Sequence, residues 1–424
     1  MKEHFNVIDF LKQNTEFIKI DEISDLLGQK VHYYGEHFKS PQNSSNYTIK
    51  NRVSDYLKLC YAILGSLTNR NKRLTVLSSS YFDVNKEIGK LGFSVQRPPW
   101  SIKLGDPIAG GCKFIFKTFI LKSRIRKLKF NELLDNDFLT LCSEFDALLK
   151  EWLIQSNVSA IIVPNDVAFF EKRLIKLSKE CNIPSFVFLH GLPGRYNLID
   201  DNRTDYLIVW GPKIKEFYIN AGFDSSKILV SGHPNYTSRE DFDSPTVSFE
   251  NILILTKSLN GTHHSDGTIL GDRGNLILYL LTIEKVLKKF GVKQVRFRPH
   301  PSENVNWYRE YLNKDFFFPD TGELKESLLK STLIIGPTST ILLESIYLGK
   351  SYIVYELSRN GQDVLNQDLV APFDGSEADI PVATSEDELY ELIHNRNTVN
   401  QSVLNDYFNP TFDLTFSKYF KKSD

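Results

Sequence analysis

The sequence predicts an α/β protein of two domains, each built on a doubly wound parallel sheet. Three observations lead to this prediction. With 424 residues, the chain is longer than one hydrophobic core usually supports, so two domains of roughly 200 residues each are expected. Short apolar runs alternate with helical patterns along most of the chain, which is typical of βαβ units. The apolar runs end in polar residues, and ligands of open α/β sheets bind outside such strand ends.

Composition excludes several classes of protein. Hydrophobic residues make up 41% and charged residues 24%, as in ordinary globular proteins, and the net charge of −1 gives no argument for nucleic acid as a partner. The four cysteines are widely spaced without a C-x-x-C pair, so neither a disulfide framework nor a thiolate zinc site is indicated. No stretch has the apolar core of a signal peptide or the ~18 apolar residues of a membrane span. We therefore expect a cytoplasmic protein.

The first half of the chain is predicted to form one doubly wound sheet. Residues 1–70 hold helical patterns to which we assign no chemistry. From residue 73 a strand, a helix ended by Gly92 and a second strand form a βαβ unit. Further strands are predicted at residues 159–166, 185–191, 205–211 and 227–234. Parallel strands share a carboxyl edge, so the residues that end them should line one edge of the sheet: Asp166, His190, Gly211 and His233.

Residues 113–130 are the one segment in which charge is segregated. They hold seven Lys or Arg, no acid and four Phe. One interpretation is a basic, aromatic amphipathic helix that contacts an anionic membrane surface, here the inner face of the cytoplasmic membrane, or a lipid-linked saccharide. The other interpretation is a solvated helix face whose apolar side packs in the core. The sequence leaves both open.

The second half carries phosphate-type chemistry after two predicted strands. Arg298, His300 and Pro301 follow the strand at 292–297, while Gly336 and residues 338–340 follow the strand at 333–335 and lead into a helical pattern. Glycine lets a backbone approach a ligand closely, and hydroxyl groups at a helix start can hold an anion. Histidine adds a donor whose charge changes near neutral pH. A phosphate site is therefore predicted here.

The HP dipeptide and the Ser/Thr pair resemble the nucleotide-binding half of bacterial GT-B glycosyltransferases of capsule and lipopolysaccharide synthesis. The most similar members use CMP-activated sialic acid or Kdo. The resemblance implies the GT-B fold, two Rossmann-like domains facing a cleft. It also implies that the CMP phosphate is held by His300 with Pro301 and by Thr338, Ser339 and Thr340.

Other donor-binding candidates follow from the order of elements in such enzymes. The loop after the strand at 252–255, with Lys257, Ser258 and Asn260, would approach the donor. Asp320 would lie near the base or ribose, and a carboxylate such as Glu356 would hold ribose hydroxyls. We add Glu344, in the helical pattern after residues 338–340, to the donor-binding candidates.

Residues 183–234 resemble the closing part of the acceptor domain of the same transferases. A strand ending in His-Gly is followed by a Trp-Gly strand and a Gly-x-Pro strand. In the related CDP-glycerol polymerases the histidine of the His-Gly pair is the base, which implies His190 here. Sialyl- and Kdo-type relatives use an acidic residue, for which Asp166 is the matching candidate. The E/D-D-G triplet of sialyltransferases is missing from the sequence.

The expected domains are residues 1–236, on the acceptor side, and residues 250–405, which bind the nucleotide sugar. A polar linker, 237–249, joins them, and residues 406–424 should form a helix that packs back toward the first domain.

The expected activity is transfer of an ulosonic-type sugar, Kdo or sialic-like, from a CMP donor to a saccharide acceptor on a lipid or polysaccharide. The alternatives are a CDP-glycerol or CDP-ribitol transferase and a non-catalytic polysaccharide-binding protein. No cofactor or metal is expected, because His263 and His264 lack a carboxylate at ligand spacing and Asp135 with Asp137 fits a solvated helix face. The Gly-Lys-Ser at 349–351 follows its helix instead of preceding it, which excludes a P-loop.

Overall fold

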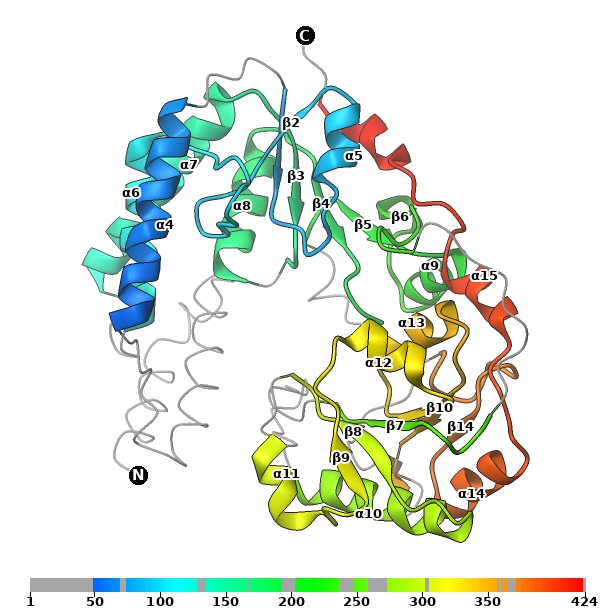
Figure 1. The fold of residues 1–424 in the computed structure, drawn as a ribbon. Helices are drawn as coiled ribbons and strands as arrows, with labels where there is room; N and C mark the ends of the chain where they lie inside the picture. The colour runs from blue at the N-terminus through cyan, green and yellow to red at the C-terminus, as the bar shows by residue number, and fades with distance from the viewer. Residues whose placement is uncertain are drawn as a thin grey trace.

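The structure is a computed structural model, and it describes residues 49–68, 74–127, 135–166, 168–192, 203–236, 247–257, 273–301, 305–356, 358–359, 362–363 and 371–421. It has two domains, each with a six-stranded parallel sheet (Figure 1). No helix among these residues is long and apolar enough to span a bilayer. The predicted fold class, α/β with two doubly wound parallel sheets in the GT-B arrangement, is confirmed.

The first sheet has the strand order β2-β1-β3-β4-β5-β6, with every neighbouring pair parallel. The strands are β1 (Thr75–Ser78), β2 (Ser94–Gln96), β3 (Val158–Val163), β4 (Ser185–Phe188), β5 (Tyr206–Val209) and β6 (Ile228–Val230). The helices of this domain are α4 (Ile49–Thr68), α5 (Asn85–Lys90), α6 (Cys112–Lys127), α7 (Asn136–Gln155), α8 (Phe169–Glu180) and α9 (Pro212–Asn220), followed by the 3-10 turn η2 (Ser225–Lys227).

Strand β3 shows why the sheet lies in the middle of the first domain. All six of its residues are buried, as expected for a parallel strand covered on both faces. Ile161 and Val163 belong to the core that includes helices α7 and α8, whereas Ala160 and Ile162 belong to the core that includes α5 and the C-terminal tail. Side chains alternate between the two faces of a strand, so one strand supplies both cores.

The second sheet has the order β14-β11-β10-β7-β8-β9 and is also parallel throughout. Its strands are β7 (Ile252–Leu255), β8 (Val295–Arg298), β9 (Phe317–Pro319), β10 (Leu333–Gly336), β11 (Tyr352–Tyr355) and β14 (Val382–Ala383), and a small hairpin joins β12 (Ser358–Arg359) to β13 (Gln362–Asp363). Its helices are α10 (Arg273–Lys289), α11 (Val305–Tyr311), α12 (Leu324–Lys330), α13 (Ile341–Tyr347) and α14 (Glu386–His394).

The strand order of the second sheet has a functional consequence. Numbered along this domain, the strands run 3-2-1-4-5-6, which is the order of dinucleotide-binding domains. The first strand, β7, lies between β8 and β10. Strands β8 and β9 are added on one side of β7, and β10, β11 and β14 on the other, so the order of strands switches between β7 and β10. Ligands of such sheets bind at the carboxyl ends of the strands at this switch point. A ligand site is therefore expected at the residues that follow β7 and β10.

The end of the chain returns from the second domain to the first. After η3 (Gln401–Val403) and α15 (Leu404–Tyr407), the tail runs along the first domain to the 3-10 helix η4 (Thr415–Tyr419) (Figure 1, red). Phe416 and Phe420 pack against Phe186 of β4 at ring-centroid distances of 5.6 and 5.5 Å. We expected one closing helix at 406–424. The tail follows an irregular path instead. It contains Pro410, which disfavours a continuous helix, and it makes backbone hydrogen bonds to the first domain, such as Lys421 N to Ser159 O (2.9 Å).

The chain passes between the domains twice, once after β6 near His233 and once on its return near Phe408, and these two segments lie side by side. His233, just after β6, is buried among aromatic rings, with centroids 4.3 Å from Tyr236 and 5.7 Å from Phe408 of the returning segment. Burial lowers the pKa of His233 to about 3, so it stays neutral, and its Nδ1 accepts a hydrogen bond from Asn235 N. At Gly211, an added Cβ would overlap the backbone of Tyr407. The returning chain thus packs directly on the first domain.

This close approach predicts that Gly211→Ala destabilises the protein. The methyl group would push the Tyr407 backbone away from α9, at a cost of about 1–3 kcal/mol, and should lower the thermal unfolding midpoint by several degrees. Gly89→Ala is the control, because nothing lies within 4 Å of a Cβ added at that position in α5 and alanine favours a helix. Equal midpoints for the two variants would refute the close contact.

Candidate active site

A lysine, a threonine and a buried glutamate meet at the switch point of the second sheet. Lys257 follows β7, Thr338 follows β10 and Glu356 follows β11. Lys257 Nζ donates to Thr338 Oγ1 at 2.9 Å and to Glu356 Oε1 at 2.7 Å. Thr338 N and Oγ1 also donate to Glu356 Oε1, both at 2.6 Å. The three adjacent strand ends are therefore joined by one hydrogen-bonded cluster.

The glutamate organises this cluster. Its side chain is 5% exposed, whereas that of Lys257 is 20% exposed. A buried carboxylate is tolerated only when it is paired and hydrogen-bonded, and Glu356 accepts from both an ammonium group and a backbone amide. Glu356 thus holds the turn at Thr338, and Lys257 is the more exposed member of the ion pair. The resemblance implied ribose binding by Glu356; in the structure its carboxylate faces these protein donors.

The neighbouring hydroxyl groups have protein partners as well. Ser339 Oγ accepts from Ile341 N at 3.3 Å. Thr340 Oγ1 accepts from Leu192 N of the first domain at 3.0 Å. The loop that carries His190 therefore docks on the turn predicted to hold phosphate. This inter-domain hydrogen bond was not foreseen from the sequence.

The packing around residue 336 explains why glycine occupies that position. An added Cβ would overlap the hydroxyl group of Tyr352 on the neighbouring strand β11. That hydroxyl donates to Pro337 O at 2.8 Å, which fixes the start of the turn. We expected the glycine to make room for a ligand, but a tyrosine takes up the space.

Arg298, His300, Pro301 and Asp320 lie at the ends of β8 and β9. Arg298 Nη1 donates to Asp320 Oδ2 at 3.1 Å and to Gly322 O at 2.6 Å, so this ion pair holds the segment before α12. His300 is exposed, and its backbone N donates to Thr256 Oγ1 at 3.1 Å, beside Lys257. Pro301 is exposed too. His300 is thus placed next to the switch point, whereas Arg298 and Asp320 bind each other.

Glu344 faces the first domain. It accepts a hydrogen bond from the hydroxyl group of Tyr236, whose ring lies 4.6 Å from that of Tyr347. Burial raises the pKa of the Glu344 carboxyl group. Glu344, predicted to bind the donor, forms part of the contact between the domains in this structure.

The two candidate bases end neighbouring strands of the first sheet. Asp166 follows β3 and His190 follows β4, and these strands pair directly. Asp166 is 3% exposed and accepts from Arg203 N at 2.8 Å; burial raises its pKa. His190 is exposed beside Tyr81, at a ring-centroid distance of 5.1 Å, and partial desolvation lowers its pKa. His190 is therefore the more accessible of the two and is neutral at pH 7.

Some predicted residues lie outside the described part of the chain: Ser258, Asn260, His263 and His264. Among the described residues, no group of three or more His, Cys, Asp or Glu is placed to hold a metal ion.

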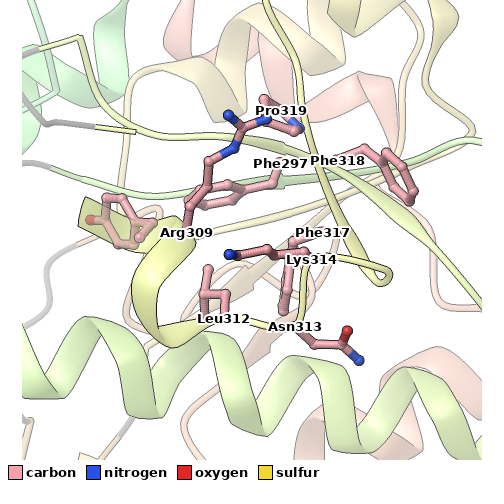
Figure 2. Close-up of a pocket in the computed structure, with 9 residues that line it drawn as sticks. Phe297, Arg309, Leu312, Asn313, Lys314, Phe317, Phe318 and Pro319 are labelled. Atoms are coloured by element: carbon pink, nitrogen blue, oxygen red, sulfur yellow. The ribbon is translucent and has the colours of Figure 1, made fainter. Parts of the chain in front are cut away.

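A separate cavity lies beside the edge strand β9, under α11 (Figure 2). It measures about 230 Å³, less than the ~300–1,000 Å³ usual for ligand pockets. Phe297, Leu312 and Phe317 give it apolar walls, and Arg309 and Lys314 lie at its side. Its lining includes neither Lys257 nor Thr338, so it is distinct from the switch point.

Comparison with known proteins finds no matching family model and no matching curated sequence. Similar solved structures include UDP-GlcNAc 2-epimerase from Neisseria meningitidis bound to UDP-GlcNAc, with 14% identity over 80% of this chain and 95% of that chain and a TM-score of 0.45. The lipopolysaccharide outer core galactosyltransferase WaaB in its apo form has 11% identity over 82% and 97%, with a TM-score of 0.43. MurG from Acinetobacter baumannii has 13% identity over 80% and 93%, with a TM-score of 0.42.

These three proteins have the GT-B fold. Similarity this distant indicates neither substrate nor reaction. The assignment of the GT-B fold to this chain rests on its two parallel sheets, their strand orders and the tail that returns to the first domain.

Proposed function

We propose that the protein is a glycosyltransferase that binds a nucleotide sugar at the switch point of the second sheet. The observation that carries this proposal is the Lys257–Thr338–Glu356 cluster at the strand ends where such sheets bind nucleotides. Lys257 is the cation of the site, held in place by Glu356, and His300 lies beside it. Together they would oppose the negative charge that develops on the departing phosphate.

The donor we propose is CMP-linked and carries an ulosonic-type sugar, Kdo or sialic-like. This choice rests on the resemblance of His300 with Pro301, and of residues 338–340, to CMP-sugar transferases. It is also chemically consistent, because a CMP leaving group has a single phosphate and needs less charge neutralisation than a diphosphate. The acceptor would be a saccharide, free or lipid-linked.

The reaction needs one base. The acceptor oxygen bonds to the anomeric carbon as the bond from that carbon to the phosphate oxygen breaks, and CMP leaves with the bonding electrons. The proton of the acceptor hydroxyl passes to the base. His190 is exposed and its pKa is lowered, so it is unprotonated at neutral pH and can accept that proton. Asp166 would need the 203–204 backbone to move away first.

The accessibility of His190 also favours a second candidate, a transferase that moves a polyol phosphate from CDP-glycerol or CDP-ribitol. In that class the histidine of the His-Gly pair is the base, as the sequence resemblance implied. Both reactions release CMP, because transfer of a polyol phosphate from CDP-glycerol leaves CMP behind, so the intact donor that binds distinguishes the two functions.

A thermal-shift panel of CMP, CDP, UMP, UDP and GDP, with a CMP-linked ulosonic sugar and CDP-glycerol as intact donors, is run in EDTA and again with Mg²⁺ or Mn²⁺ to test the donor class. A ligand that binds only the folded protein raises the unfolding midpoint. CMP should give the largest rise, and the rise should persist in EDTA because Lys257 replaces a metal. A larger rise with CDP-glycerol than with the CMP-linked sugar selects the polyol-phosphate function. No rise with any nucleotide, or a rise that requires Mg²⁺ or Mn²⁺, contradicts the proposed site.

Replacing Lys257 separates its two roles. Lys257→Met should weaken nucleotide binding at least about tenfold and, by leaving Glu356 buried without its partner, should destabilise the fold by on the order of 3 kcal/mol. The double variant Lys257→Met/Glu356→Gln removes the unpaired charge, so stability should largely return while nucleotide binding stays weak. Wild-type affinity in the double variant would show that Lys257 serves only the fold.

The base can be assigned with two variants. His190→Ala should lower turnover by ~100-fold or more with nucleotide binding retained, whereas Asp166→Asn keeps an oxygen acceptor for the 203–204 backbone and should retain most of its turnover. In the wild type, turnover should fall only as the pH drops below the ordinary histidine pKa of 6.5, because the folded protein lowers that value. Loss of turnover in Asp166→Asn alone would assign the base to Asp166.

A further inference from the structure

The cavity beside β9 has aromatic walls that are held in place by the core of the second domain. The ring of Phe297 on β8 lies edge-on to Tyr308 of α11 and to Phe317 of β9, at centroid distances of 5.2 and 5.9 Å. These three residues and Leu312 are at most 7% exposed and belong to that core. Because close-packed side chains keep their positions, the walls exist before any ligand arrives.

The size of the cavity suits a small molecule. A cavity of roughly 150 Å³ with apolar walls holds one benzene molecule. The volume here is about 230 Å³, which leaves room for one aromatic ring and one small substituent.

Two cations line the cavity next to its apolar walls (Figure 2). Arg309 and Lys314 are exposed, and neither side chain has a hydrogen-bond or ion-pair partner within the described part of the chain. The amide group of Asn313 between them is already engaged, since its Nδ2 donates to Glu284 Oε1 at 3.0 Å. No Asp or Glu is among the described residues that line the cavity. Its lining therefore carries two positive charges and no negative charge.

The edge of the sheet at β9 is closed to an extended peptide. Phe317 N already donates to Asn313 O at 3.0 Å, and Pro319, two residues later, has no N–H. Neither residue can therefore donate to an added strand. The expected occupant is a small molecule instead.

We propose that the cavity beside β9 binds a small aromatic anion. The ring of the ligand packs against Phe297 and Phe317, where it can adopt the edge-to-face geometry that aromatic pairs prefer. Its acidic group, a carboxylate or a phosphate ester, accepts hydrogen bonds from Arg309 and Lys314. The proposal does not depend on the proposed transferase activity, because the lining shares no residue with the Lys257–Thr338–Glu356 cluster.

Fluorine NMR of the full chain tests the proposal with three probes of one ring size: 4-fluorobenzoate, 4-fluorophenyl phosphate and the neutral 4-fluorobenzyl alcohol. At least one anionic probe should bind about fivefold or more tightly than the alcohol, because only the anions pair with the two cations. The tighter anion identifies the acidic group. Equal affinity for all three probes, or binding of none, overturns the proposal.

Saturating CMP separates this cavity from the switch point. Binding of the anionic probe should be unchanged by CMP, whether or not CMP itself binds. Displacement of the probe by CMP would place the probe at the switch point and overturn the proposal.

A charge variant and a matched control locate the acidic group. Arg309→Gln/Lys314→Gln should bind the preferred anion about fivefold more weakly and the alcohol as the wild type does. Its unfolding midpoint should be unchanged, because both side chains are exposed and unpaired. The control Lys58→Gln/Lys86→Gln removes two exposed cations of the first domain and should keep wild-type affinity. An equal loss in both variants would show a general effect of net charge and refute the site.

A second variant locates the ring. Leu312→Phe places a larger side chain in the cavity wall, so it should weaken the anionic probe and the alcohol alike, by about fivefold or more. Its unfolding midpoint should fall by a few degrees at most, since the added volume enters a cavity. Wild-type affinity for both probes in a folded Leu312→Phe would show that they bind elsewhere. If this variant does not fold, the charge variant decides the proposal.

Discussion

The burial of one carboxylate determines how the candidate site is built. Glu356 is nearly inaccessible at the end of β11, and a charge in that position must be compensated by donors from its neighbours. Lys257 and the Thr338 turn meet that requirement, each from a different strand. The same requirement fixes an ammonium group and a turn at the switch point of the sheet. A fold-stabilising interaction and a potential anion site are thereby combined in three residues.

Much of the fold could be predicted from the sequence because its signals are local. Strands such as β3 and β10 are short apolar runs rich in Val and Ile; β3 is followed by Pro164 and Asn165, and β10 ends at Gly336. The helices between them follow from their apolar spacing. The placement of Asp166 and His190 at one sheet edge also follows, because it needs only that β3 and β4 be parallel neighbours.

The partners of the site residues could not be predicted, since they come from distant parts of the chain. Thr340 and Leu192 are 148 residues apart in sequence, and the loop before β5 that covers Asp166 lies 37 residues beyond it. Gly336 illustrates a second limit: a glycine at a strand end suits a ligand or a close side chain equally well, and Tyr352 decides the matter only once β10 and β11 are paired. Sequence patterns give the position of a side chain, whereas its partner depends on tertiary structure.

The returning tail has a mechanical consequence for the two domains. The chain passes between them near His233 and again near Phe408, and these crossings touch each other, with Asn409 N bonded to Trp210 O at 2.7 Å. Two adjacent connections would act as a hinge between the domains. The domains could rotate about the axis on which both connections lie, whereas other relative rotations and translations would be resisted. Inter-domain contacts away from that axis, such as the hydrogen bond from Leu192 N to Thr340 Oγ1, would then break and re-form together in one hinge motion. Access to the strand ends of both sheets would change together along that single motion.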